Sequence, residues 1–213
     1  AASRHRSIAR HAVAGDAHGR AWPAGDASHP AAGAWRRDAV AATAAWALWI
    51  AEVNLCPFAR KSLETSDAIS YVVTEADNQK AFYAAAVACA RDLAAASDVD
   101  PTAAIVFLVA PFYEARDFPA FLRSVEALED DVLPFDEVQI AGFHPAWAFG
   151  GVPDDDPLHF EKRAPHPTVS LVLVDGLEHA NSAKIAADNE RILSQLGVAE
   201  VARAFAGFVS SSD

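Results

Sequence analysis

The chain has 213 residues, of which 52% are hydrophobic and 22% charged, and its formal net charge is −12. This length fits one globular domain with a hydrophobic core. The negative charge disfavours binding to nucleic acid, which requires a basic face. No apolar run of about eighteen residues is free of charges, so no membrane-spanning helix is predicted. The two cysteines, Cys56 and Cys89, are too few for a disulfide framework or a four-thiolate zinc site, which favours a reducing compartment.

The N-terminal segment differs from the rest of the chain in charge. The first 38 residues carry six Arg and three Asp, whereas the remaining 175 carry eleven basic and twenty-six acidic side chains. Arg-rich, Ala-rich and acid-poor N-termini are typical of organelle transit peptides, and the absence of Met from the chain suggests a processed start. Residues 1–34 have too few apolar groups to offset their chain entropy by burial. We therefore expect a basic extended arm over 1–34 that is held only by docking on its own domain or on a partner.

The predicted elements follow in chain order from residue 35. Residues 35–53 are Ala-rich with a broad apolar face, which predicts a helix that ends near Cys56, because a residue before Pro disfavours the helical conformation. Runs of β-branched, aromatic and other apolar residues predict four strands, at 69–74, 104–109, 138–143 and 169–174. Further helices are predicted at 77–96, 117–131, 176–195 and 198–209. Asp77 is the predicted cap of the first of these, and the Pro-rich residues 144–167 are predicted to form an irregular loop.

This alternation of strands and helices predicts an α/β or α+β fold. We expect a layered sandwich in which a mixed sheet of about four strands packs against helices. A single domain is expected over residues 35–209, preceded by the extended arm.

Three short segments hold the residue types that carry chemistry. They are residues 54–59 at the end of the first helix, 139–145 leaving a strand, and 162–167 entering the last strand. Because strand ends gather at one rim of a sheet, we expect Cys56, His144, Arg163 and His166 to meet there. In a catalytic interpretation Cys56 is a nucleophilic or redox thiol and His144 is its base. Arg163 then holds an anionic group of the substrate.

Each of these residues also has a structural interpretation. Cys56 fits a small buried residue at a helix end, and His144 fits a rim histidine that is hydrogen-bonded to its loop. Arg163 fits an ion pair with one of the acidic residues at 154–156. A metal site made of His144, His166 and Asp154 is a weaker third interpretation, because these residues have no fixed chelating spacing.

Several segments of the chain resemble the DUF1415 proteins of bacteria and algae. The resemblance is carried by residues 49–61, 104–111, 118–130, 138–151 and 162–174. Its most specific pieces are NLCPF at 54–58 and FHP at 143–145. It covers about residues 46–200, leaves the arm outside, and implies no established activity.

The chain departs from the pattern of these relatives near its last strand. Relatives tend to have Asn-Arg-Ser-Pro-Tyr-Pro where this chain has Lys-Arg-Ala-Pro-His-Pro at 162–167. They also tend to have a His and an Arg where this chain has Ser170 and, approximately, Leu173. Cys56, His144 and Arg163 are kept. The resemblance therefore implies a recruited, non-catalytic copy, which keeps the scaffold of the family and has lost some of its polar groups.

Two functions are therefore expected. The first is a non-catalytic accessory or structural subunit of a large organellar complex, with a photosynthetic complex of the chloroplast favoured over a mitochondrial one. Its arm, residues 1–34, would contact other protein subunits, and the chain would be soluble or peripheral at a membrane complex. The alternative is a small-molecule or thiol-redox enzyme that uses Cys56 and His144, with Arg163, at a sheet-edge site. No metal is favoured, and no cofactor or pigment is identified.

Overall fold

The computed structural model describes residues 30–56, 59–60, 62, 69–97, 105–111, 113, 118–132, 138–173 and 182–210. The elements in these ranges are, in order, α2 (Pro30–Glu52), β1 (Ile69–Val73), α4 (Gln79–Ser97), β2 (Ile105–Val109), α5 (Phe118–Val132), β3 (Val138–Phe143), the 3₁₀ helix η2 (Pro157–Glu161), β4 (Thr168–Leu173), α6 (Ser182–Leu196) and α7 (Val198–Ser210). A four-stranded mixed sheet with packing helices confirms the predicted layered fold.

Three of the strands end at the same edge of the sheet. The strand order is β1-β2-β4-β3, with β1 parallel to β2 and with β4 antiparallel to both of its neighbours. The carboxyl ends of β1, β2 and β3 therefore meet at one edge, which we call the rim, and β4 begins there. Backbone pairing continues at the rim, where the amide of Ala110 donates to the carbonyl of Pro167 at 2.8 Å. The predicted gathering of strand ends is thus observed.

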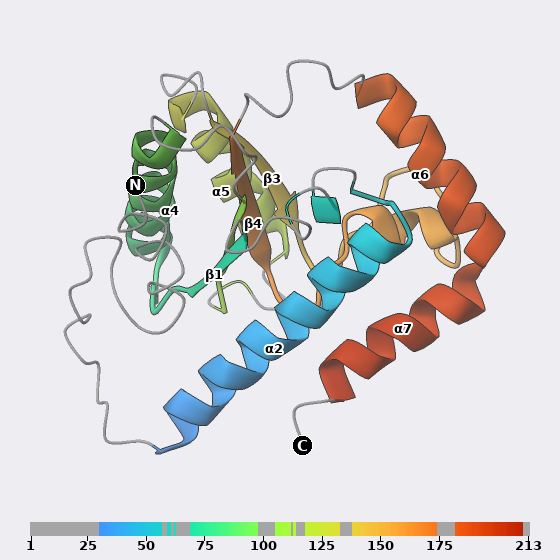
Figure 1. The fold of residues 1–213 in the computed structure, drawn as a ribbon, viewed down its shortest axis with the longest axis horizontal. Helices are drawn as coiled ribbons and strands as arrows, with labels where there is room; N and C mark the ends of the chain where they lie inside the picture. The colour runs from blue at the N-terminus through green and yellow to red at the C-terminus, as the bar shows by residue number, and fades with distance from the viewer. Residues whose placement is uncertain are drawn as a thin grey trace.

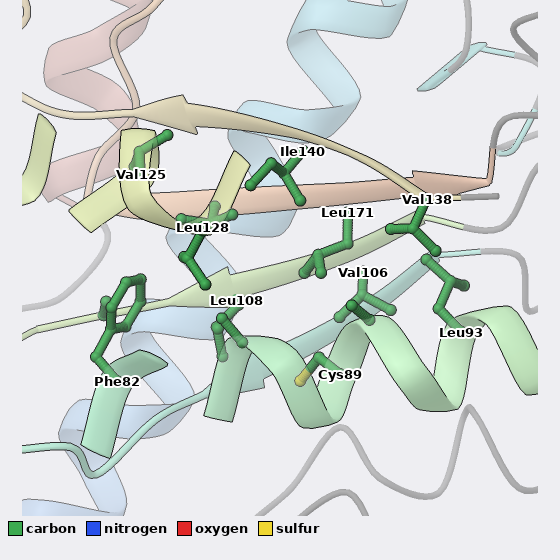
Figure 2. Close-up of a cluster of buried hydrophobic side chains, with 14 of the residues drawn as sticks. Phe82, Cys89, Leu93, Val106, Leu108, Val125, Leu128, Val138, Ile140 and Leu171 are labelled. Carbon is green, nitrogen blue, oxygen red and sulfur yellow. The ribbon is translucent and has the colours of Figure 1, made fainter. Parts of the chain in front are cut away.

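Helices cover both faces of the sheet (Figure 1), with α4 and α5 on one face and α2, α6 and α7 on the other. Each face has its own apolar cluster. The first cluster lies between the sheet and α4 and α5 (Figure 2), and the second surrounds Trp46 of α2. Side chains alternate between the faces along a strand, so Ile140 of β3 belongs to the first cluster and Phe143 packs against the second. Strand β2 is buried on both faces, as its continuous apolar sequence predicts.

Two predicted boundaries are wrong by a few residues. Helix α2 begins at Pro30 rather than at residue 35, because Pro has no N–H to lose at a first helical position and its φ already suits a helix. The last five residues of the predicted arm are therefore helical, and residues 1–29 lie outside the described part of the chain. Helix α4 is capped by Asn78, whose Oδ1 accepts from the amide of Ala81 at 3.0 Å, and not by Asp77.

The predicted irregular loop at 144–167 contains one short regular element, η2. Its cap is Asp156, whose side chain accepts a hydrogen bond from the amide of Leu158 at 2.8 Å. This loop connects the rim end of β3 to the start of β4, so its geometry decides where the predicted site residues lie. None of the helices that the structure describes has both the length and the hydropathy needed to cross a membrane.

Candidate functional site

His144 directly follows β3 and is completely buried. The amide of Ala146 donates to its Nδ1 at 3.1 Å, so Nδ1 carries no proton. Nε2 is therefore protonated, and it donates to the carbonyl oxygen of Tyr113 at 3.0 Å. The imidazole also packs against Phe121, with ring centroids 5.2 Å apart. Both ring nitrogens are thus engaged by the backbone, which is the arrangement of the structural interpretation.

His159, which sequence reasoning missed, is held in the same way. It is buried in η2, its Nδ1 accepts from the amide of Phe149 at 3.1 Å, and its Nε2 lies 2.8 Å from the carbonyl oxygen of Pro153. An irregular loop has many backbone groups without ladder partners, and a neutral imidazole can satisfy one donor and one acceptor at once. The sequence signal that could have identified His159 was its position inside the irregular loop at 144–167. His159 thus braces the loop from within, whereas His144 connects it to Tyr113 outside the loop.

Cys56 lies just after α2 and is half-buried against the second apolar cluster. Its Sγ accepts a hydrogen bond from the amide of Ala59 at 3.4 Å. The His144 ring instead contacts Phe121, which belongs to the first cluster on the opposite face of the sheet. Cys56 and the His144 ring thus pack against apolar clusters on opposite faces of the sheet.

Lys162 is the basic residue that comes close to Cys56. Its Nζ lies 5.1 Å from the centre of the Phe143 ring, which packs against the second cluster. Burial lowers the pKa of Lys162, and three negative groups oppose this shift, namely Glu161, Glu129 and Cys56 in its thiolate form. The cysteine thus has an ammonium in its electrostatic neighbourhood. The sequence offered no signal for this pairing, because the two residues are about a hundred positions apart.

Arg163 is positioned by one hydrogen bond and one aromatic ring. Its Nε donates to the carbonyl oxygen of Trp147 at 2.9 Å, and its Cζ lies 4.6 Å from the centre of the Phe160 ring. Burial lowers its pKa. The alternative prediction, an ion pair with an acidic residue at 154–156, is not observed, since the guanidinium has no carboxylate partner within the described ranges.

His166 lies three residues after Arg163, and its ring is close to Trp35 near the start of α2. Its ring is 6.0 Å from that of Trp35 in an edge-on contact, and burial lowers its pKa. The described residues contain no group of three or more potential metal ligands. Asp154 is exposed, and the ring nitrogens of His144 are already engaged. These contacts give no support to a metal site made of His144, His166 and Asp154.

Ser170 and Leu173 of β4 face opposite sides of the sheet. Leu173 belongs to the first apolar cluster. Ser170 pairs in register with Phe107, which packs against Trp46 on the other face. The indole Nε1 of Trp46 is the one buried side-chain nitrogen or oxygen in the described part of the chain that lacks a hydrogen-bond partner. Such a donor costs about 1–3 kcal/mol, so this side of the core is incompletely satisfied.

Comparison with known proteins gives one match. A family model described as "Protein of unknown function (DUF1415)" matches residues 38–203. No curated protein and no solved structure shows significant similarity to the chain. The match includes Cys56, His144 and Arg163 and excludes residues 1–37, which contain the predicted arm. Because this match covers most of the chain, the chain belongs to the DUF1415 family.

Proposed function

We propose that this chain is a non-catalytic accessory subunit of a large protein assembly. The observation that carries the proposal is the state of His144, whose two ring nitrogens are both bonded to the backbone. A general base needs a nitrogen within hydrogen-bond reach of the group that it deprotonates. His144 has no such nitrogen, and Cys56 lies on the other face of the sheet. The contacts of His144 therefore support a structural role for this histidine rather than a role as a base.

The charge pattern of the sequence supports docking of the N-terminal segment on partner proteins. The first 38 residues carry an excess of Arg, whereas the rest of the chain is strongly acidic. A basic segment of this kind is attracted to acidic surfaces on partner proteins. Its composition is typical of organellar proteins. We therefore propose that residues 1–34 contact other subunits, that the protein resides in an organelle, with the chloroplast favoured over the mitochondrion, and that the assembly is photosynthetic.

Deletion of residues 1–29 tests this function without shortening α2, which begins at Pro30. The full chain and the deleted chain, each with a C-terminal tag, are expressed in the native source and separated by size. We expect the full chain to elute with a large assembly and the deleted chain to elute near its own mass. A matched variant keeps the length and replaces the four arginines at 4, 6, 10 and 20 by Gln, and it should behave like the deletion. Undiminished co-elution of the deleted chain contradicts the proposal.

A thiol enzyme is the second candidate, and one observation favours it. The Sγ of Cys56 accepts the amide of Ala59, and the charge of Lys162 is close enough to interact with the thiolate. Hydrogen bonds to sulfur and nearby cations both favour the nucleophilic thiolate. In this function Lys162 takes the place that the sequence assigned to His144.

The pH dependence of alkylation by iodoacetamide separates the two candidates. A catalytic Cys56 should react quickly even below about pH 7, where an ordinary thiol is almost fully protonated. The variant Lys162→Gln should then slow the reaction at that pH, and Lys184→Gln, at an exposed position on α6, should not. The accessory function predicts that Cys56 reacts as an ordinary thiol and that neither substitution changes its pH profile.

A further inference from the structure

The guanidinium of Arg163 has one hydrogen-bonding edge without a partner. The Nε–H bond to the carbonyl of Trp147 uses one edge, and the ring of Phe160 covers a face of the guanidinium plane. The other edge carries Nη1 and Nη2. Neither atom has a hydrogen-bond partner among the residues that the structure describes, and neither is among the buried unsatisfied atoms, so this edge reaches solvent.

The acidic residues nearest in sequence are engaged elsewhere. Glu161 accepts a hydrogen bond from the side-chain amide of Asn189 on α6, with 3.0 Å between Oε1 and Nδ2. Asp156 accepts the amide of Leu158 at the start of η2. The positive charge of Arg163 is therefore not neutralised by a neighbouring carboxylate in the described part of the chain. Arg163 is thus a cation without a carboxylate partner among the described residues of a protein whose net charge is −12.

The two groups that position the guanidinium, the carbonyl of Trp147 and the ring of Phe160, are themselves held in place. The amide of Trp147 donates to the carbonyl of His144 at 3.0 Å, in the turn that the His144 ring fixes. Phe160 is buried and packs edge-on against Phe205 of α7 at 4.9 Å. A side chain positioned in advance loses less conformational freedom on binding than a mobile surface arginine does.

We propose that the Nη1–Nη2 edge of Arg163 binds an oxyanion, a carboxylate or a phosphate group, through two parallel hydrogen bonds. The two donors of this edge match the spacing of two oxygens on either group. Lys162, the preceding residue, is a second cation, and its Nζ lies 5.1 Å from the centre of the Phe143 ring. Burial lowers the pKa of His166, which favours its neutral form, so the positive potential of this segment comes from Lys162 and Arg163. This binding does not depend on the assembly role proposed above.

Nuclear magnetic resonance of the full ¹⁵N-labelled chain tests the site directly. The Nε–Hε resonance of Arg163, assigned by its loss in Arg163→Gln, is followed while sodium phosphate or sodium succinate is added. A sodium chloride series at equal ionic strength is the control. We expect a saturable shift with at least one of the two oxyanions and none with chloride. A shift that does not saturate with either oxyanion, or that chloride reproduces, overturns the proposal.

Three variants separate specific binding from general charge. We expect Arg163→Gln to weaken binding by roughly tenfold to a hundredfold, as loss of a charge-assisted pair does. Arg163→Lys keeps the charge but loses the two-donor edge, and it should also weaken binding by about tenfold. Arg203→Gln removes an exposed arginine of α7 and should leave the affinity within about twofold of the parent. Equal affinity of the parent and of Arg163→Gln contradicts the proposed site. If Arg163→Gln does not fold, the titration of the parent chain alone decides whether the oxyanion binds.

Discussion

At the scale of single residues, two buried histidines, His144 and His159, hold the backbone of the loop at 144–167 through hydrogen bonds. His144 and His159 each accept one backbone amide and bond one backbone carbonyl. The sequence showed that His144 lies at a strand end, which the structure confirms. It could not show the tautomer, because the tautomer depends on Ala146 and Tyr113, whose positions are set by the fold.

Replacing His144 by Ala tests this structural role. The substitution removes the acceptor of the Ala146 amide and the N–H that donates to the carbonyl of Tyr113, and it opens a cavity beside Phe121. We expect the free energy of unfolding in urea to fall by about 3 kcal/mol. His166→Ala, at a half-buried ring that packs edge-on against Trp35, should cost less than about 1 kcal/mol. Equal stability of His144→Ala and the parent would show that the ring does not hold the loop.

Cys89 predicts a loss of stability in alkaline solution. Burial, followed by the charge of Asp92, raises the pKa of Cys89 to about 12, whereas an unfolded cysteine titrates near 8.5. Between these values the unfolded chain loses the proton and the folded chain keeps it. Stability therefore falls as the pH rises, by up to about 1.4 kcal/mol per pH unit.

Urea unfolding at pH 8 and pH 10 measures this effect. The loss between the two pH values should be smaller in Cys89→Ala than in the parent by about 1–2 kcal/mol. The control is Val87→Ala, a half-buried neighbour on α4 without a titratable group, which should lower stability equally at both pH values. The same alkaline loss in Cys89→Ala and in the parent rules out this assignment.

At the scale of elements, each strand was predicted within one residue at each end. The loop at 144–167 was predicted least well. Strand β2 has five consecutive buried residues, so its apolar run marks it in the sequence. The start of α2 and the short helix η2 were missed. Both begin at a proline, Pro30 and Pro157, and a proline alone is as compatible with a turn as with a helix start.

The close approach of β3 and α5 predicts an intolerance to side chains at Gly142. A Cβ there would lie 3.0 Å from a methyl carbon of Val125 and 3.2 Å from the Phe121 ring. We expect Gly142→Ala to lower the free energy of unfolding by about 1–3 kcal/mol. Gly150→Ala is the matched control, because a Cβ at Gly150 meets no atom within 4 Å. Thermal or urea unfolding compares the two, and equal stability of both variants contradicts the packing of β3 on α5.

At the scale of the whole molecule, the layered fold and the gathering of strand ends followed from the sequence, whereas the packing of Cys56 and His144 against different apolar clusters did not. Residues of a strand alternate between its faces, so a shift of one residue in register moves a side chain to the other face. Whether His144 shares the face of Phe143 or of Gly142 is decided by packing against α5. The electrostatic interaction of Lys162 with Cys56 left no signal in the sequence, because the two residues are about a hundred positions apart.

The size at which the chain exists in its native source tests its proposed role as a subunit most directly. A native extract is separated by size-exclusion chromatography and probed for this chain, with the variant lacking residues 1–29 run in parallel. We predict that the full chain elutes with an assembly many times larger than its own 22.6 kDa and that the shortened chain elutes near the monomer. Elution of the full chain near 22.6 kDa would contradict a role as a subunit.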